Sequence, residues 1–140
     1  MEELLTLRQH LEAKNYEAAL AIVNELEEMS REDKINKIFS FSIILLQHII
    51  KKKAENRTTN SWEASIKEAS IQIRRINSRR KAGGTYITDT ELRENLEEAF
   101  PVAIAKAASE AFGGAMDEQE LMKKISKKAI LDEAFSMIAQ

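Results

Sequence analysis

The sequence has no cysteine, a single proline, and only four glycines, which occur as two pairs. The lack of cysteine excludes disulfides and thiolate metal sites, and it fits a reducing compartment. Because glycine and proline interrupt regular structure, their scarcity in 140 residues predicts that regular elements dominate the fold. Met1-Glu2-Glu3 is acidic where a secretory signal carries basic residues, so we expect a cytoplasmic protein without a membrane segment.

Charge is present in both signs, but it is unevenly distributed along the chain. Residues 1–50 have a net charge of −4, residues 51–81 of +7 and residues 82–140 of −5, from 5, 10 and 6 basic against 9, 3 and 11 acidic side chains. This acidic, basic, acidic pattern fits a local anion-binding patch. It fits equally well an internal match between neighbouring helices.

The most apolar stretch is residues 38–50, in which nine of thirteen side chains are Ile, Leu or Phe. It is too short to cross a bilayer, which takes about 20 apolar residues. Upstream, Ser30-Arg31-Glu32-Asp33 resembles a helix capping box, and downstream Lys51-Lys52-Lys53 suits the negative end of a helix dipole. The stretch therefore predicts a mostly buried central helix near residues 33–53. Its helical wheel leaves one strip for solvent, formed by Asn36, Ser40, Gln47 and Lys51.

Further helices are predicted on both sides of the central one. Leucines three and four residues apart predict a helix from Glu2 to about Lys14, and the apolar pattern resumes after Asn15 as far as Ser30. Residues 54–61 read as a polar loop with Asn60 or Ser61 as a helix cap. A helix is then predicted from Trp62 to about Lys81, ended by the pair Gly83-Gly84.

The C-terminal part predicts two more helices. The first begins at a capping box, Thr88 to Glu91, and contains Pro101, where we expect a kink or a break. Its second half is rich in alanine and should pack closely on a neighbour. Asp117 with Glu120 caps the last helix. Together these elements predict an all-α fold, a single-domain bundle of about five helices over residues 1–140.

Several segments resemble one known family. Residues 45–51, then Arg57, then residues 61–68 (SWEASIKE) are similar to its Leu-Leu-x-His-Leu-Leu-Lys core, Arg-rich loop and Ser-Trp helix start. Residues 25–31, 96–101 and 130–135 also resemble family segments. The family is domain of unknown function family 29, which is abundant in cyanobacteria. The resemblance implies a small, mostly helical bacterial protein, and it lends the chain no activity.

His48 is the strongest candidate for chemistry. Its functional interpretation is a general base or phosphate contact, supported by Glu25 or Glu28 and by Arg57. The alternative is a partly buried imidazole paired with one carboxylate or carbonyl, and we favour this structural interpretation. The sequence has two isolated histidines and no cysteine, so we expect no metal site. It also has no glycine-rich phosphate-binding loop, so we expect no cofactor.

Basic residues give the clearest binding signal. Lys67, Arg74 and Lys81 repeat every seven residues as a stripe that could follow a phosphate backbone. A second cluster lies at the end of the preceding helix, and in an antiparallel pair the two clusters fall at opposite ends. The alternative is a solvated face that pairs with acidic side chains. The candidate anion-binding residues are Lys51, Lys52, Arg57, Lys67, Arg74 and Lys81.

No known catalytic constellation is visible, so the leading expectation is a non-enzymatic protein-interaction or regulatory module. Its partner is expected to be another protein or a second copy of the chain, and no cofactor is expected. The alternative is a nucleic-acid-binding protein, or a small RNA-directed enzyme, that uses residues 51–81.

Overall fold

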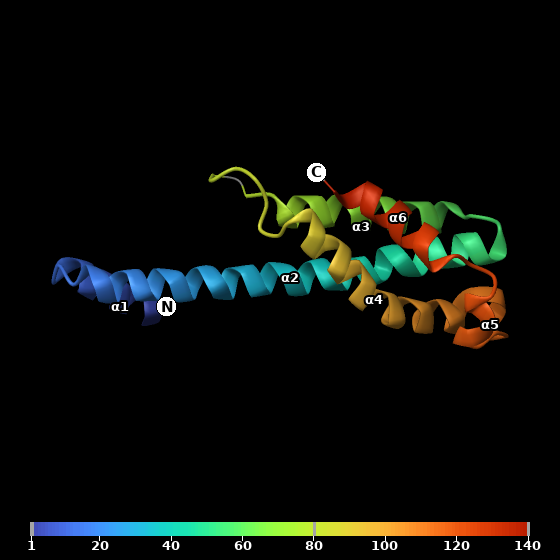
Figure 1. The fold of residues 1–140 in the computed structure, drawn as a ribbon, viewed down its shortest axis with the longest axis horizontal. Coiled ribbons are helices and arrows are strands. Elements are labelled where there is room, and N and C mark those ends of the chain that lie inside the picture. Colours follow the sequence, from blue (N-terminus) through green and yellow to red (C-terminus); the bar gives the residue numbers. More distant parts are fainter. Residues whose placement is uncertain (1, 80, 140) are drawn as a thin grey trace. The chain divides into compact units, whose positions relative to one another are not determined.

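The computed structural model of this chain describes residues 2–79 and 81–139. These described residues form six α-helices and no strand, which confirms the all-α prediction (Figure 1). The chain divides into two compact units, Met1–Lys34 and Ile35–Gln140, and helix α2 (Tyr16–Glu55) contributes residues to both. That residues 1–140 form a single domain stays a prediction.

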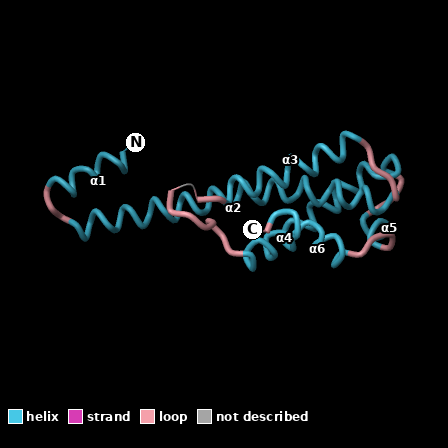
Figure 2. Tube along the Cα trace, turned by 90° about the horizontal axis from the view of Figure 1, so that it is seen from above, coloured by secondary structure: helices cyan, strands magenta, loops and turns pink. Residues whose placement is uncertain are grey.

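The first unit is a helical hairpin of α1 (Glu2–Glu12) and the beginning of α2, which Figure 2 shows as two helices joined by a short turn. Lys14 has a φ of 60°, and this left-handed residue ends the first helix. The Asn15 side chain then accepts a hydrogen bond from the backbone N–H of Ala18 at 3.3 Å. The break that the sequence predicted at Asn15 is confirmed. Residues 2–34 are called the hairpin below.

Helix α2 runs through Ser30 without interruption, so the helix start predicted there is wrong. A capping side chain stabilises a helix start by about 1 kcal/mol, but a continuing helix keeps its backbone hydrogen bonds. Residues 1–82 contain no glycine and no proline, which could have broken those hydrogen bonds. The predicted central helix is therefore the second half of a 40-residue helix.

The second unit is built around that second half of α2. It comprises α3 (Asn60–Asn77), α4 (Asp89–Glu110), the short 3-10 turn η1 (Ala111–Gly114), α5 (Glu118–Met122) and α6 (Lys127–Ile138). Helix α6 packs against both α3 and α4, and α5 packs against α4 (Figure 1). One apolar core joins these helices, and its α2 members are Ile38, Leu45, Leu46, Ile49 and Ile50.

Both ends of α3 differ from the prediction. Thr59, rather than Asn60 or Ser61, caps the helix by accepting a hydrogen bond from the backbone N–H of Trp62. The helix ends at Asn77, before the glycine pair. The buried Asn77 side chain accepts from the backbone N–H of Ile87 at 2.9 Å and donates to its carbonyl at 3.4 Å. Backbone bonds from the Tyr86 N–H to the Asn77 carbonyl at 2.9 Å and from the Arg79 N–H to the Gly84 carbonyl at 3.0 Å replace those of a further helical turn.

Helix α4 begins as predicted, because Thr88 and Glu91 form the reciprocal hydrogen bonds of a capping box. It then continues through Pro101 to Glu110, so the chain does not break at the proline. The expected close packing of its alanine-rich half is confirmed. The buried small residues are Ala99, Ala103, Ala107, Ala108 and Ala111.

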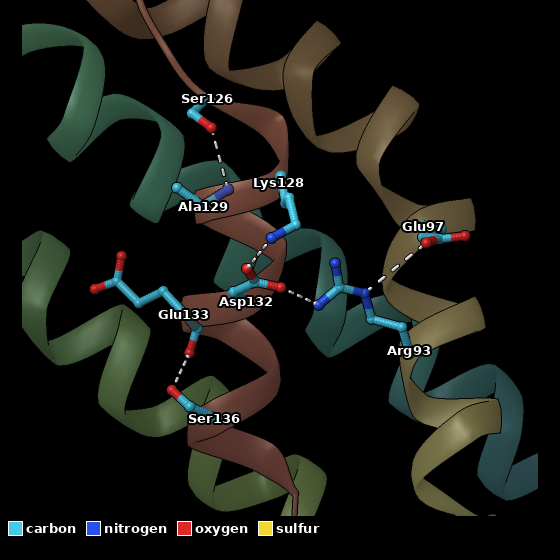
Figure 3. A network of polar contacts seen from close by, with 8 residues as sticks. All are labelled: Arg93, Glu97, Ser126, Lys128, Ala129, Asp132, Glu133 and Ser136. Atoms are coloured by element: carbon cyan, nitrogen blue, oxygen red, sulfur yellow. Dashed lines mark hydrogen bonds and ion pairs between the residues drawn. The ribbon is translucent and has the colours of Figure 1, made fainter.

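The segment predicted as one last helix is two helices. Asp117 caps the five-residue α5, and Ser126 caps α6 by accepting a hydrogen bond from the backbone N–H of Ala129. Figure 3 shows how α6 is fixed to α4: Arg93 donates to Asp132 at 2.6 Å across the two helices. This guanidinium holds the pKa of the Asp132 carboxyl below its usual range.

Candidate functional site

A buried cation lies at the end of α2. Lys51 is only 5% exposed, and its Nζ donates to Glu110 Oε2 on α4 at 2.6 Å. Gln47, one helical turn earlier on the same face, donates from Nε2 to Glu110 Oε1 at 3.0 Å. These bonds hold the pKa of Glu110 below its ordinary value, chiefly through Lys51. Of the four residues predicted to face solvent, Asn36 and Ser40 are exposed. The prediction is wrong for Gln47 and Lys51, which are buried.

Two cations lie over the ring of Trp62, the third residue of α3. The Lys51 ammonium lies 4.8 Å from the ring centroid, and the Arg57 guanidinium lies 4.7 Å from it. Arg57 also pairs with Glu55 at 3.2 Å. Cation–π contacts of this length hold both the loop and the helix start in place. The ring is half-buried and engaged by these contacts within the chain.

His48 lies on the same turn of α2 as these groups. Burial lowers its pKa, the neighbouring Lys51 ammonium lowers it further, and the Glu110 carboxylate opposes them. The imidazole is therefore neutral at pH 7. Its Nδ1 is buried without a hydrogen-bond partner among the described residues. Of the expected helpers, Arg57 stacks on Trp62, and Glu25 belongs to the hairpin.

The other cations of this end of the unit are also paired. Lys52 bonds to Glu63 at 2.7 Å, and Lys53 pairs with Glu133 at 3.4 Å. The hydrogen bond to Glu63 raises the pKa of Lys52 and lowers that of Glu63. A concavity of about 270 Å³ opens here, lined by Lys52, Lys53, Asn56, Arg57 and Thr58. Carboxylates of the same unit thus already neutralise the cations that line it.

The basic residues Arg74 and Arg75 lie in the last turn of α3, whose 18 residues span about 27 Å along the helix axis. The two clusters therefore stay apart, as expected. The stripe itself is shorter than predicted, because Lys67 and Arg74 are on the helix but Lys81 follows its end. Arg79 lies over the Tyr86 ring at 5.6 Å, and the next residue, Arg80, is outside the described residues.

Within residues 2–79 and 81–139, no group of three His, Cys, Asp or Glu side chains is arranged to hold a metal ion. None of the helices in these same ranges is both long and apolar enough to cross a membrane.

The hairpin has a surface that the sequence did not single out as functional. Of its described residues only Ala19 is buried, whereas six large apolar side chains are exposed. Spacing identifies an apolar face, but it does not show whether a neighbour covers that face. The exposed side chains are Leu4, Leu5, Leu11, Tyr16, Leu20 and Met29.

Comparison with known proteins identifies the family. The pattern of the family described as "Domain of unknown function DUF29" matches residues 6–136, so the chain belongs to this family and the expected resemblance is confirmed. Neither a curated protein nor a solved structure matches the chain.

Proposed function

We propose that this member of the DUF29 family is a non-enzymatic protein-interaction or regulatory module that docks a protein through its hairpin. One observation carries the proposal: residues 2–34 keep six large apolar side chains in water and bury only Ala19 among those described. Single exposed apolar residues are ordinary on protein surfaces. Six of them on two short helices are typical of a surface that another chain covers.

The polar cluster around Lys51 supports the same proposal. Lys51 and Gln47 both bond to Glu110, and Arg57 is held by Glu55 and Trp62. Side chains that satisfy one another in this way fasten α2, α3 and α4 together, which is the ordinary use of buried polar groups. A cytoplasmic location, in keeping with the lack of cysteine, is part of the proposal.

The proposal is tested by site-specific photo-crosslinking in cells that make the protein. A photoreactive phenylalanine analogue replaces Leu20, which is 60% exposed, or Val102, an exposed apolar residue of α4 in the second unit. We expect a discrete protein adduct at position 20 and none at position 102. If neither position, or both equally, gives an adduct, the hairpin is not a docking surface.

A second candidate function is nucleic-acid binding by α3 and the turn after it. One observation favours it: Lys67, Arg74, Arg75, Arg79 and Lys81 are all exposed, with a single carboxylate, Glu68, among residues 64–81. We propose to test it by titrating RNA and DNA at several salt concentrations. Binding that weakens steeply with added salt, and that is lost when the charges of Lys67, Arg74 and Lys81 are reversed, would support this function. A lack of binding at low salt would contradict it.

A further inference from the structure

We infer that the hairpin docks onto the hairpin of a second copy of this chain, so that two hairpins form a four-helix bundle. This inference rests on the proposed function and names the partner of the same surface. It depends on three properties of residues 2–34: where the exposed apolar side chains lie, how much area they offer, and where the acidic side chains lie.

The first property is that four exposed apolar side chains share one side of the hairpin. At about 100° per residue, Leu4 and Leu11 lie roughly 100° beyond the inward face of α1, which half-buried Leu7 and His10 mark. Tyr16 and Leu20 lie roughly 90° beyond the inward face of α2, marked by Ala19, Ile22, Val23 and Leu26.

Equal rotations along two antiparallel helices point to the same side of the pair. Leu4, Leu11, Tyr16 and Leu20 therefore form one face, to which both helices contribute; it is called the apolar side below. A surface two helices wide matches another layer two helices wide, and two such layers make a four-helix bundle. Pairing of one face with itself about a two-fold axis also needs no second, complementary surface.

The second property is the area. Each of the four side chains is about half exposed, between 49% and 64%. At roughly 100 Å² for each, the apolar side offers about 400 Å². A standard interface buries about 800 Å² per partner, of which roughly 60% is apolar. The apolar side therefore supplies most of the apolar area that a stable dimer needs, and the neighbouring polar side chains would supply the rim.

The third property is the charge of the hairpin, which is −5 from four basic and nine acidic side chains in residues 1–34. On the wheel, Glu17, Glu28 and Glu32 lie on the side of α2 that faces away from α1. Pairing through the apolar side leaves these three carboxylates in water, whereas Glu27, seven residues after Leu20 and on the same side of α2, lies beside the contact. Two acidic hairpins still repel one another at a distance, and added salt screens that repulsion.

Salt dependence consequently separates a second copy from a foreign basic partner. A dimer of acidic hairpins tightens as salt rises, because screening removes repulsion while apolar contact is kept. A complex between the acidic hairpin and a basic protein loosens under the same change.

The test begins with light scattering on the purified full chain over a wide range of concentrations. We expect a mass twice the 15.9 kDa of one chain, with a dissociation constant that falls severalfold as salt is raised. The double variant Leu11→Glu/Leu20→Glu should be a monomer. The matched control Ile71→Glu/Val102→Glu alters two exposed apolar residues of the second unit and should stay dimeric.

A second measurement avoids destabilising changes and uses the lack of native cysteine. Leu20→Cys should form a covalent dimer with a short bis-maleimide linker, whereas Val102→Cys should not. The inference is overturned by a monomer at every concentration, by a dimer that salt weakens, or by a dimer that survives the hairpin variant.

The photo-crosslinking experiment distinguishes a failure of the second copy as partner from a failure of the proposed docking function. An adduct at position 20 that contains a different protein overturns the second copy as partner but upholds the docking function. The absence of any adduct specific to position 20 overturns both. A covalent dimer of the chain supports both.

Discussion

The two halves of helix α2 show how one regular element can serve two purposes. In its first half, residues 16–34, Ala19 alone is buried among the described side chains. In its second half, residues 35–55, a mixture of apolar and polar side chains is buried against α3, α4 and α6. The backbone is helical throughout, so the difference arises from what covers each half. The buried residues of the second half are Ile38, Ser42, Leu45, Leu46, Gln47, Ile49, Ile50 and Lys51.

The second unit has an apolar core of its own, whereas the hairpin buries little apolar area within the chain. A pair of helices with so little buried apolar area is marginal by itself, because ordering each residue costs about 1–2 kcal/mol. The predictions below test this difference, from the largest expected effect to the smallest.

The largest effect should come from truncating matched leucines in the two halves of α2. Leu46 is fully buried and Leu20 is 60% exposed. Leu46→Ala should lower the free energy of unfolding by about 2–5 kcal/mol, because it removes apolar contacts and leaves a cavity. Leu20→Ala should change it by no more than about 0.5 kcal/mol in dilute, monomeric protein.

Urea denaturation followed by circular dichroism measures both variants. At concentrations where the chain associates, Leu20→Ala should weaken the dimer while Leu46→Ala affects the fold of each copy. Equal losses for the two variants in dilute protein would remove the distinction between the halves.

A somewhat smaller effect is expected at Asn77, which has no counterpart in the hairpin. Asn77→Ala removes the partner of the buried backbone N–H of Ile87. An unsatisfied buried donor costs about 1–3 kcal/mol, and the turn from residue 78 to 88 should lose hydrogen-exchange protection before the rest of the unit. Ser78→Ala, which changes the half-buried neighbouring residue, is the matched control. Equal protection in the two variants would show that Asn77 does not hold this turn.

The sequence predicted the fold well wherever an element depends on its own residues. Residues 38–50 are apolar around most of the wheel, and Thr88 with Glu91 carries its capping signal within four positions. Predictions failed where a distant residue decides the outcome. Helix α3 ends at Asn77, whose backbone carbonyl and side chain are bonded by the backbone of Tyr86 and Ile87, nine and ten residues later.

The candidate site was less predictable for the same reason. The wheel of α2 placed Gln47 and Lys51 toward solvent, since it contains no information about Glu110, 59 residues beyond Lys51. The reverse error affects the hairpin. Leu11 and Leu20 have the spacing of core residues, and only the structure shows that no described neighbour covers them.

The next effect concerns the Lys51–Glu110 pair, in which the Lys51 side chain is buried and the Glu110 side chain is exposed. The Lys51 side chain is 6% exposed and that of Glu110 is 49% exposed. Glu110→Gln leaves a buried ammonium with weaker compensation, so we expect a loss of about 1–2 kcal/mol. Lys51→Met leaves a carboxylate that water can reach, and it should cost less than about 1 kcal/mol. Chemical denaturation of the two variants measures this asymmetry, and a larger loss for Lys51→Met would contradict it.

The smallest effect is a pH dependence that belongs to the second half of α2. Burial lowers the pKa of His48 from its ordinary value of 6.5, so the unfolded chain binds this proton more readily than the folded chain. The contribution of neutral His48 is therefore complete above pH 6.5 and is lost as the pH falls from 6.5 through the folded-state pKa. Glu110 acts in a separate window, because its pKa is lowered from 4.5 and its contribution is lost only below that pH. Thermal melting of His48→Leu should lack the first loss and keep the second, whereas Lys51→Met should weaken the second. A wild-type melting temperature that is constant from pH 7.5 to about 5 would show that His48 is as easily protonated in the folded chain as in the unfolded one.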